Sequence, residues 1–327
     1  MSKKKIRFGI LGCADIARRK FIPALKKCKD AELGAIASRS SKKACEVAGK
    51  YGVEFCSYDE LIEASNIDAI YIPLPNIYHY EWTLKALSCG KHVLCEKPIA
   101  LDYVSAKKII KKARAKKKAL MEGYMFLFHP QHKIIKKIIN DGAIGKIRIF
   151  CSSFGFALKD RNNFRLKKGM GGDALYELGG YPIRAMRYFI GQPLEEISGF
   201  SFYDSRKIQI SYRALLAFSG GVSAYINGGY DQAYECYYQI VGDKASLTLE
   251  RCYTTPSDMK NVISIRKDND IKQIQVGACD HFLEMINHFC EAVNLPQKRE
   301  RLYNEIDKQA KMVDTISLHL KKMRLSK

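Results

Sequence analysis

Residues 9–17 (GILGCADIA) decide how the first part of the chain folds. They begin inside the apolar run Ile6–Leu11, which is typical of a buried strand, and they continue into a helical segment. Gly12, Ala14 and Ala17 occupy the small-residue positions of a strand-to-helix turn that brings backbone N–H groups close to phosphate. Alanine at position 14 narrows that approach, so the stretch alone also fits a merely tight turn. Its place at the head of a strand–helix series favours dinucleotide binding.

Short β-branched runs alternate with longer amphipathic stretches between Ile6 and about Met125. The predicted strands are Ile6–Leu11, Leu33–Ser38, Glu54–Ser57, Ala69–Leu74, His92–Glu96 and Ala119–Met125. The predicted helices are Ser41–Tyr51, Tyr58–Ala64, Ile77–Cys89 and Tyr103–Ala115. Strands that alternate with helices form a parallel sheet covered on both faces. The sequence therefore predicts an α/β protein whose residues 1–125 form an N-terminal, doubly wound Rossmann domain.

The pattern changes after Pro130, where strands follow one another with few helices between them. The predicted strands are Ile147–Phe156, Ile197–Tyr203, Ile210–Phe218, Val222–Gly229, Cys236–Val241, Ser246–Glu250, Val262–Arg266 and Lys272–Val276. The predicted helices are Gln131–Asp141, Asp173–Phe189, His281–Val293 and Tyr303–Met323. Most of these strands alternate apolar with polar residues, as in a sheet with one packed and one wetter face. We expect residues 126–327 to form an α+β domain for substrate binding and oligomerisation, built on a large, mainly antiparallel open sheet.

The chain is strongly basic, with 55 Lys and Arg residues against 34 Asp and Glu among 327 residues, a net charge of +21. Many of the basic residues gather in the stretch 107–118, where helical spacing spreads them over a broad solvated face without interleaved aromatic residues. Attraction to phosphate leaves nucleic-acid binding open as an alternative, but no recognition motif accompanies the charge. We therefore expect no nucleic-acid partner and a general attraction for anionic small molecules.

No apolar run approaches the ~20 residues that cross a bilayer, and the start of the chain lacks a signal-peptide core. We expect a cytoplasmic protein with no membrane partner. The eleven cysteines are scattered without a Cys-x-x-Cys pair, which favours buried free thiols. His129 and His132 form an isolated His-x-x-His pair without an acidic or thiol ligand nearby, so we expect no metal.

The end of the second predicted strand indicates which dinucleotide binds. An acidic residue there would accept a hydrogen bond from the ribose 2′-OH of NAD and repel a 2′-phosphate. The chain instead has Ser38, Arg39 and Ser40, with no carboxylate until Glu46. Arg39 can pair with the phosphate and stack on adenine, while the serine hydroxyls donate hydrogen bonds. The alternative is a solvated arginine in a turn; the sequence favours NADP(H).

Glu96, Lys97 and Pro98 end the fifth predicted strand, at the edge where open α/β sheets bind ligands. A lysine held there by a following proline, in an unusual peptide geometry, can reach a nicotinamide and the reacting carbon. Together with residues 9–17, 73–79, 90–98 and 171–181, this motif resembles the Gfo/Idh/MocA oxidoreductase family. The resemblance covers nearly the whole chain, including the change from a doubly wound domain to an open sheet.

One helix departs from the pattern of many family members, which carry Asp-x-Gly-x-His-x-x-Asp there. Residues 177–184 read ELGGYPIR, so Tyr181 stands in the histidine position and Arg184 in that of the last aspartate. The departure argues against a dehydrogenase of inositol or simple polyols. Residues 12–17, 125–132 and 181–185 are similar to NADPH-dependent nucleotide-sugar 3-ketoreductases of deoxysugar biosynthesis.

The resemblance implies hydride transfer from NADPH to the ketone of a nucleotide-linked deoxysugar, with Lys97 and Tyr181 as catalytic residues. Tyr181 would donate the proton, while Lys97 beside it would lower the phenol pKa and stabilise the oxyanion. The alternatives are a strand-end surface lysine and a packed helix aromatic.

The resemblance also implies binding residues. Those for the cofactor are Gly12, Cys13, Ala14, Asp15, Ile16, Ser38, Arg39, Ser40, Leu74, Pro75, Asn76, His79, Glu96 and Lys97. Those for the substrate are Gln131, Arg165 and Tyr181. Gln131 and Arg165 also fit structural roles, His79 a cap or core residue, and Glu96 either an orienting partner of Lys97 or a helix cap.

Two other functions stay open: an NADP-dependent dehydrogenase of free sugars or trans-dihydrodiols, and a non-catalytic regulator that senses a dinucleotide. The expected partners are a nucleotide-sugar or other small carbohydrate and further copies of the chain. The uncovered face of the second sheet favours burial against such a copy, as a homodimer or homotetramer.

Overall fold

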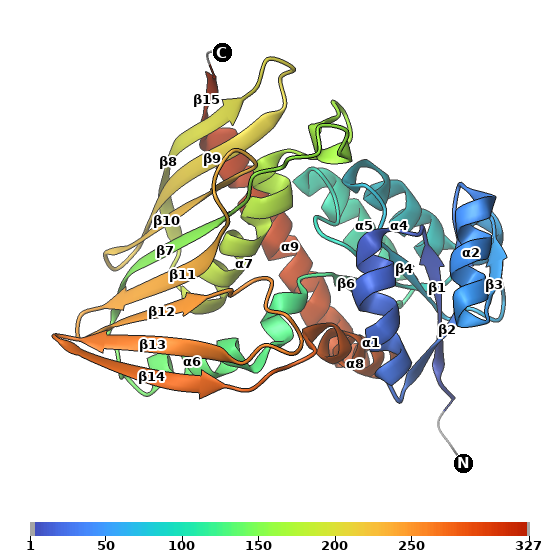
Figure 1. Cartoon of the computed structure of the whole chain (residues 1–327), viewed down its shortest axis with the longest axis horizontal. Helices are drawn as coiled ribbons and strands as arrows, with labels where there is room; N and C mark the ends of the chain where they lie inside the picture. The colour runs from blue at the N-terminus through green and yellow to red at the C-terminus, as the bar shows by residue number, and fades with distance from the viewer. Residues whose placement is uncertain (1–3, 326–327) are drawn as a thin grey trace. The chain divides into compact units, whose positions relative to one another are not determined.

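The computed structural model of the chain describes residues 4–325, and Figure 1 traces the order of its helices and strands. These residues form two compact units. The first combines the chain up to Met125 with Phe282–Ala310, and the second combines Phe126–His281 with the residues from Lys311 onward. Among the described residues, no helix combines the length and the hydropathy that a bilayer-spanning segment requires.

The first unit contains a six-stranded parallel sheet in the order β3-β2-β1-β4-β5-β6. Its strands are β1 (Ile6–Leu11), β2 (Ala31–Ala37), β3 (Glu54–Cys56), β4 (Ala69–Ile72), β5 (His92–Cys95) and β6 (Leu120–Glu122). Its helices include α1 (Ile22–Lys27), α2 (Ser41–Tyr51), α3 (Tyr58–Glu63), α4 (His79–Ser88) and α5 (Tyr103–Ala115). The first strand lies in the middle of the sheet, and the chain winds outward from it in both directions. The predicted doubly wound Rossmann fold is confirmed.

The core of this unit follows from strands that are apolar on both faces. All four residues of β4 are buried, as are Phe8 and Ile10 on β1. Phe21 stacks on the β4 residue Tyr71 with ring centroids 3.6 Å apart. Continuous apolar runs of this kind are expected where helices cover both faces of a parallel sheet.

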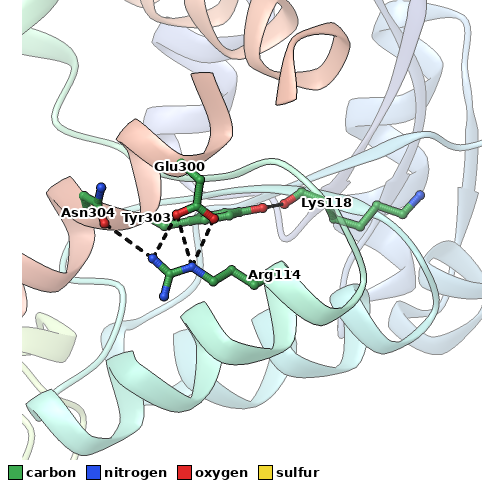
Figure 2. A network of polar contacts seen from close by, with 5 residues as sticks. All are labelled: Arg114, Lys118, Glu300, Tyr303 and Asn304. Carbon is green, nitrogen blue, oxygen red and sulfur yellow. Dashed lines mark hydrogen bonds and ion pairs between the residues drawn. The ribbon is translucent and has the colours of Figure 1, made fainter. Parts of the chain in front are cut away.

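Helix α8 (His281–Asn294) and the first part of α9 (Pro296–His319) also pack in the first unit, whereas the sequence had placed residues 282–310 in the second domain. Phe289 of α8 lies 5.5 Å from Phe8 between ring centroids. In Figure 2, Tyr303 donates a hydrogen bond to the Lys118 carbonyl, and Arg114 contacts the Glu300 carboxylate at 3.0–3.2 Å. The apolar side chains of α8 find their partners on β1, which explains the difference.

The second unit contains a nine-stranded sheet in the order β14-β13-β12-β11-β7-β10-β9-β8-β15. Its strands are β7 (Ile147–Gly155), β8 (Leu194–Tyr203), β9 (Gln209–Phe218), β10 (Val222–Gly229), β11 (Glu235–Gly242), β12 (Ser246–Glu250), β13 (Asn261–Lys267), β14 (Asp270–Val276) and β15 (Lys321–Arg324). Only the neighbours β7–β10 and β8–β15 run parallel among these strands. The predicted large, mainly antiparallel open sheet is confirmed.

One face of this sheet is packed. Tyr212, Ala214 and Leu216 of β9 are buried, while Arg213 and Leu215 between them are exposed. Helix α7 (Gly180–Phe189) packs against β7 and β10, and α6 (Pro130–Asn140) against β13. The alternation predicted from the sequence therefore separates a helix-covered face from an accessible one.

Candidate active site

Gly12 ends β1 in a conformation that favours glycine, with φ at +104°. Its N–H donates to the Ala37 carbonyl at 2.7 Å, which ties the turn to the end of β2. A Cβ atom at position 12 would lie 2.9 Å from Leu74 Cδ2, in the turn after β4. Both the backbone angle and the close approach therefore require glycine at this point of the predicted motif.

The helix after this turn contains a π-helical segment, Ala17–Phe21, before α1 begins. Ala17 is buried, as expected for the small third residue that packs the helix close to the sheet. Cys13 and Ala14 are half-buried and Asp15 is exposed, so the turn itself remains accessible. π-Helical turns are frequent at functional sites, and this one directly follows the turn that the sequence predicts to bind phosphate.

A cavity of about 730 Å³ lies beyond the carboxyl ends of β2 and β4. Ser38, Arg39, Leu74 and Pro75, four of the predicted cofactor residues, line it. The remaining lining residues are Phe55, Cys56, Ser57, Tyr58, Asp59, Glu60, Tyr78, Glu81 and Trp82. Ligands of open α/β sheets bind at the carboxyl edge of the strands, so the cavity agrees with the predicted dinucleotide site.

The arginine in this cavity is available for an anion. Within residues 4–325, no carboxylate forms an ion pair with Arg39, whose guanidinium lies 5.7 Å from the ring centroid of Tyr78. Burial raises the pKa of Tyr58, and the neighbouring Arg39 charge opposes that rise. Ser40 caps α2 by accepting from the Lys43 N–H at 3.4 Å, so a helix N-terminus also points here. A guanidinium beside a helix N-terminus fits the 2′-phosphate of NADP(H).

His79 joins two turns instead of facing the open cavity. The side chain is fully buried, with Nδ1 at 2.7 Å from the Pro98 carbonyl and Nε2 at 2.7 Å from the Leu74 carbonyl. It therefore holds the turn after β4 against the turn after β5. Asn76, in the same turn as Leu74, is also buried. These positions agree with the core role that the sequence left open for His79.

The Glu96–Pro98 turn is fixed from several sides. The Lys97–Pro98 peptide is cis, the unusual geometry that the sequence suggested. Glu96 Oε1 accepts from the Tyr71 hydroxyl at 2.6 Å, and a Cβ at Gly123 would lie 3.3 Å from Glu96 Cδ. Lys97 is only 8% exposed, which argues against a solvated surface lysine.

Tyr181 lies in the first turn of α7, inside a cluster of aromatic rings. Its ring centroid is 5.0 Å from that of Phe154 and 5.7 Å from those of Phe126 and Tyr253. The residue is 6% exposed. A second π-helical segment, Leu175–Gly179, precedes α7 directly. Both helices that carry predicted site motifs thus contain π-helical turns.

Arg165, a second residue predicted for the substrate, also lies in the second unit and is bound to Glu177. Arg165 Nε donates to Glu177 Oε1 at 2.8 Å, and its guanidinium lies 4.7 Å from the Phe164 ring centroid. Burial has the largest single influence and lowers the pKa of Arg165, but Glu177, Tyr230 and Tyr181 together raise that pKa above its ordinary value.

Gln131 lies in the interior of the second unit. It is fully buried; Nε2 donates to the Cys252 carbonyl at 3.2 Å and Oε1 accepts from Asn261 at 2.9 Å. His132 beside it contacts the Tyr238 hydroxyl at 2.9 Å, and burial lowers the His132 pKa to about 3. This network supports the structural alternative for Gln131, and its substrate role stays a prediction.

Neither the paired histidines nor the thiols form a metal site. Within the described part of the chain, no group of three His, Cys, Asp or Glu side chains is placed to hold an ion. The eleven cysteines are free thiols, and five of them are buried.

Sequence reasoning missed the aromatic wall of the first cavity and the partner of Arg165. Tyr78 and Trp82 follow the Pro75 turn at helical spacing, a signal that could have been used. The Arg165–Glu177 pair joins residues of different elements, and no local pattern announces it.

The comparisons with known proteins agree with this architecture. Residues 6–124 match the oxidoreductase family with an NAD-binding Rossmann fold, and residues 132–248 match the GFO/IDH/MocA C-terminal domain.

Among curated proteins, the chain is similar to dTDP-3,4-didehydro-2,6-dideoxy-alpha-D-glucose 3-reductase from Actinomadura kijaniata. The two are 37% identical over 314 residues, 95% of this chain and 94% of that protein. The reductase of the same name from Saccharopolyspora spinosa is 32% identical over 89% of this chain and 88% of its own. D-xylose 1-dehydrogenase (NADP(+)) 2 from Haloferax volcanii is 27% identical over 88% of each chain.

A solved structure agrees with these relatives. The 3-ketoreductase from Actinomadura kijaniata, crystallised with NADP and TDP-benzene, has a TM-score of 0.96 and 34% identity. The match covers 99% of this chain and 100% of that one. With both family domains matched and relatives above 30% identity along nearly the whole length, the chain belongs to the Gfo/Idh/MocA family of NAD(P)-binding oxidoreductases.

Proposed function

We propose that the protein is an NADP(H)-dependent reductase of the ketone in a nucleotide-linked deoxysugar. One observation carries the proposal: the near full-length similarity to dTDP-sugar 3-reductases, in a chain that has Lys97 at the sheet edge and Tyr181 in the second unit. The arginine in the cofactor cavity supports the choice of NADP(H).

The residues of the first unit fit a phosphorylated dinucleotide. Gly12 through Ile16 would hold the pyrophosphate at the helix N-terminus, and Arg39 with Ser38 and Ser40 would hold the 2′-phosphate. Leu74, Pro75 and Asn76 would contact the cofactor at the neighbouring turn. When bound, the reduced nicotinamide supplies the hydride.

The chain itself would manage the proton and the developing negative charge. The Tyr181 hydroxyl donates its proton to the ketone oxygen as that oxygen becomes an alkoxide. The Lys97 ammonium stabilises the same negative charge, and Glu96, tied to Tyr71, keeps the lysine turn in place. A residue that is 8% exposed exerts its charge with little screening from water.

For the substrate, Arg165 and Gln131 remain the proposed contacts from the second unit, although both side chains already hold protein partners. We also propose a homodimer or homotetramer. The accessible face of the second sheet exposes Ile149, Leu215 and Tyr225, and an apolar face of this kind is typical of an interface. Leu215→Glu should lower the mass measured by analytical ultracentrifugation.

A substrate panel tests the function directly. The purified protein is given NADPH with dTDP-linked 3-keto sugars, and NADP⁺ with free xylose and trans-dihydrodiols, while the absorbance of NADPH is followed. Turnover with the nucleotide-linked ketones supports the proposal. Turnover confined to free sugars or diols would instead favour a dehydrogenase like its xylose-oxidising relative. Tight NADPH binding without turnover on any ketone or alcohol would favour a non-catalytic regulator.

A further inference from the structure

An ion pair in the second unit lies one helical turn before Tyr181. Arg165 Nε is 2.8 Å from Glu177 Oε1, and Nη2 contacts the same oxygen. The Glu177 side chain is 3% exposed and that of Arg165 is 27% exposed. A carboxylate so buried is stable only while its partner stays in place, because an unpaired buried charge is costly.

Arg165 is also held by its surroundings. It lies in the 3-10 turn Phe164–Leu166 with its guanidinium over the Phe164 ring. A Cβ on Gly172 would lie 2.3 Å from Arg165 Cα, so two chain segments cross in contact there. The Tyr230 hydroxyl closes the crossing by donating to the Gly172 carbonyl at 2.8 Å. A guanidinium held in this way can exert its charge on neighbouring protein groups, but it is not free to move toward a ligand.

The neighbour that matters is Tyr181. Glu177 lies in the π-helical segment, and Tyr181 lies in α7, which follows it directly. The two residues are four positions apart, so their side chains leave the helix on the same side. Arg165 is bound to Glu177 at 2.8 Å, one turn from Tyr181, and Tyr181 is the weakest of the groups that raise the pKa of Arg165. The adjacent phenols Tyr230 and Tyr253 stay neutral, because burial raises their pKa values well above the ordinary range.

We propose that Arg165 is a positioning residue for Tyr181: its guanidinium, fixed by Glu177, stabilises negative charge on the Tyr181 oxygen. Proton donation by Tyr181 rests on the function proposed above, whereas the electrostatic effect rests on the ion pair alone. In the reaction, the O–H bond of Tyr181 breaks and a new O–H bond forms on the substrate oxygen. In this proposal, the charge of the guanidinium stabilises the phenolate that remains until it regains a proton from solvent.

Because Arg165 and Glu177 carry opposite charges, removing one or the other should shift the titration of Tyr181 in opposite directions. Arg165→Met leaves the Glu177 carboxylate near the phenol, so Tyr181 should lose its proton at a pH roughly one unit higher. Glu177→Gln leaves the guanidinium without its counter-charge, so the same event should occur roughly one unit lower. The double variant removes both charges and should return close to the native value, and Arg165→Lys should stay close to it.

The measurement is the ¹³C resonance of tyrosine Cζ in labelled protein, titrated with pH, and Tyr181→Phe identifies the signal. Arg206→Met is the matched control, since Arg206 pairs with Asp204 at 2.7 Å in an exposed turn of the same unit. It should leave the Tyr181 titration unchanged. If Arg165→Met fails to fold, the double variant is compared with the single variant Glu177→Gln instead. This comparison also removes the guanidinium, but it leaves no unpaired carboxylate buried. The double variant must then titrate higher.

Shifts in opposite directions support the inference. Shifts in the same direction, or no shifts, overturn the inference and mean that the Arg165–Glu177 pair only stabilises the fold. The pH profile of kcat with a keto-sugar separates the two proposals. Resonance shifts without turnover keep the electrostatic role and remove the reductase, whereas turnover without resonance shifts does the reverse.

Discussion

The turn that carries Lys97 and the helix that carries Tyr181 are stabilised in different ways. In the first unit, the Lys97 turn contains a cis peptide and is held by two side chains, His79 at the Pro98 carbonyl and Tyr71 at Glu96. In the second unit, Tyr181 is surrounded by aromatic rings, and the Arg165–Glu177 ion pair lies one turn before it along the helix. Side chains from separate elements support both arrangements, but only the first contains a run of consecutive residues, Glu96-Lys97-Pro98, that makes it recognisable in the sequence.

The largest expected effect tests whether Tyr181 is more than part of an aromatic cluster. Tyr181→Phe should lower kcat about 10²-fold or more, because the general acid is lost, while NADPH affinity stays nearly native. Steady-state kinetics and fluorescence titration of NADPH measure the two quantities. Tyr253→Phe deletes a hydroxyl from the same cluster, one that contacts Ser152 Oγ at 2.7 Å, and should keep kcat. Equal losses of kcat in the two variants would mean that Tyr181 contributes only to packing.

The next effect belongs to the first unit. Arg39→Asp should weaken NADPH binding about 10-fold or more, because a carboxylate repels the 2′-phosphate, and it should change NADH binding little. Binding titrations with both cofactors measure this. Lys50→Asp, the same charge change at the other end of α2, is the control and should spare NADPH. Equal losses for NADPH and NADH would show that Arg39 does not select the cofactor.

A smaller effect is expected behind the lysine turn. Tyr71→Phe removes the hydrogen bond to Glu96 and should lower kcat a few-fold, roughly 1 kcal/mol in barrier or less. Tyr303→Phe removes a hydroxyl that donates to Lys118 in the same unit, and it should reduce the free energy of unfolding without changing kcat. Kinetics together with denaturant unfolding compare the two variants. An unchanged kcat for Tyr71→Phe would mean that catalysis does not depend on the hydrogen bond between Tyr71 and Glu96.

The last comparison of the two units concerns acid stability. Burial lowers the pKa of His92 in the first unit to about 3, helped by Lys118 and Arg299, and burial lowers that of His132 in the second unit to about 3. Both stay neutral when folded but take up protons near pH 6.5 when unfolded. The free energy of unfolding should thus fall as pH drops from about 6.5 toward 3. Denaturant melts of His92→Gln and His132→Gln should each show a shallower fall; an unchanged slope would contradict the assignment.

Most of the fold could be predicted because its elements carry periodic patterns. Tyr103–Ala115 and Val222–Gly229 have the predicted bounds, and burial alternates along them as expected. Helix α9 begins at Pro296, seven residues before the predicted Tyr303, because its first two turns are polar and lack an apolar period. Strand β15 was missed and the last helix extended over it, since all four of its residues are exposed and leave no hydrophobic signature.

The candidate site divides in the same way. Gly12 and Lys97 could be found because backbone geometry restricts which residue fits beside the strand ends. Gln131 was expected at the substrate but is buried in a network with Asn261, more than a hundred positions away. Glu177 was missed as the partner of Arg165. Long-range pairing of polar side chains leaves no periodic trace in a sequence.

The long helix α9 belongs to both units, since its residues up to Ala310 are grouped with the first and those from Lys311 with the second. The Rossmann unit is therefore not a segment that can be cut from the chain at Met125. In a fragment that stops at Met125, the Phe8 ring would lose the cover of Phe289. The fragment would also lack the Tyr303 hydroxyl that donates to the Lys118 carbonyl. The first core is thus complete only after residues 282–310 have been synthesised, so its N-terminal strands must wait for a helix that is made much later.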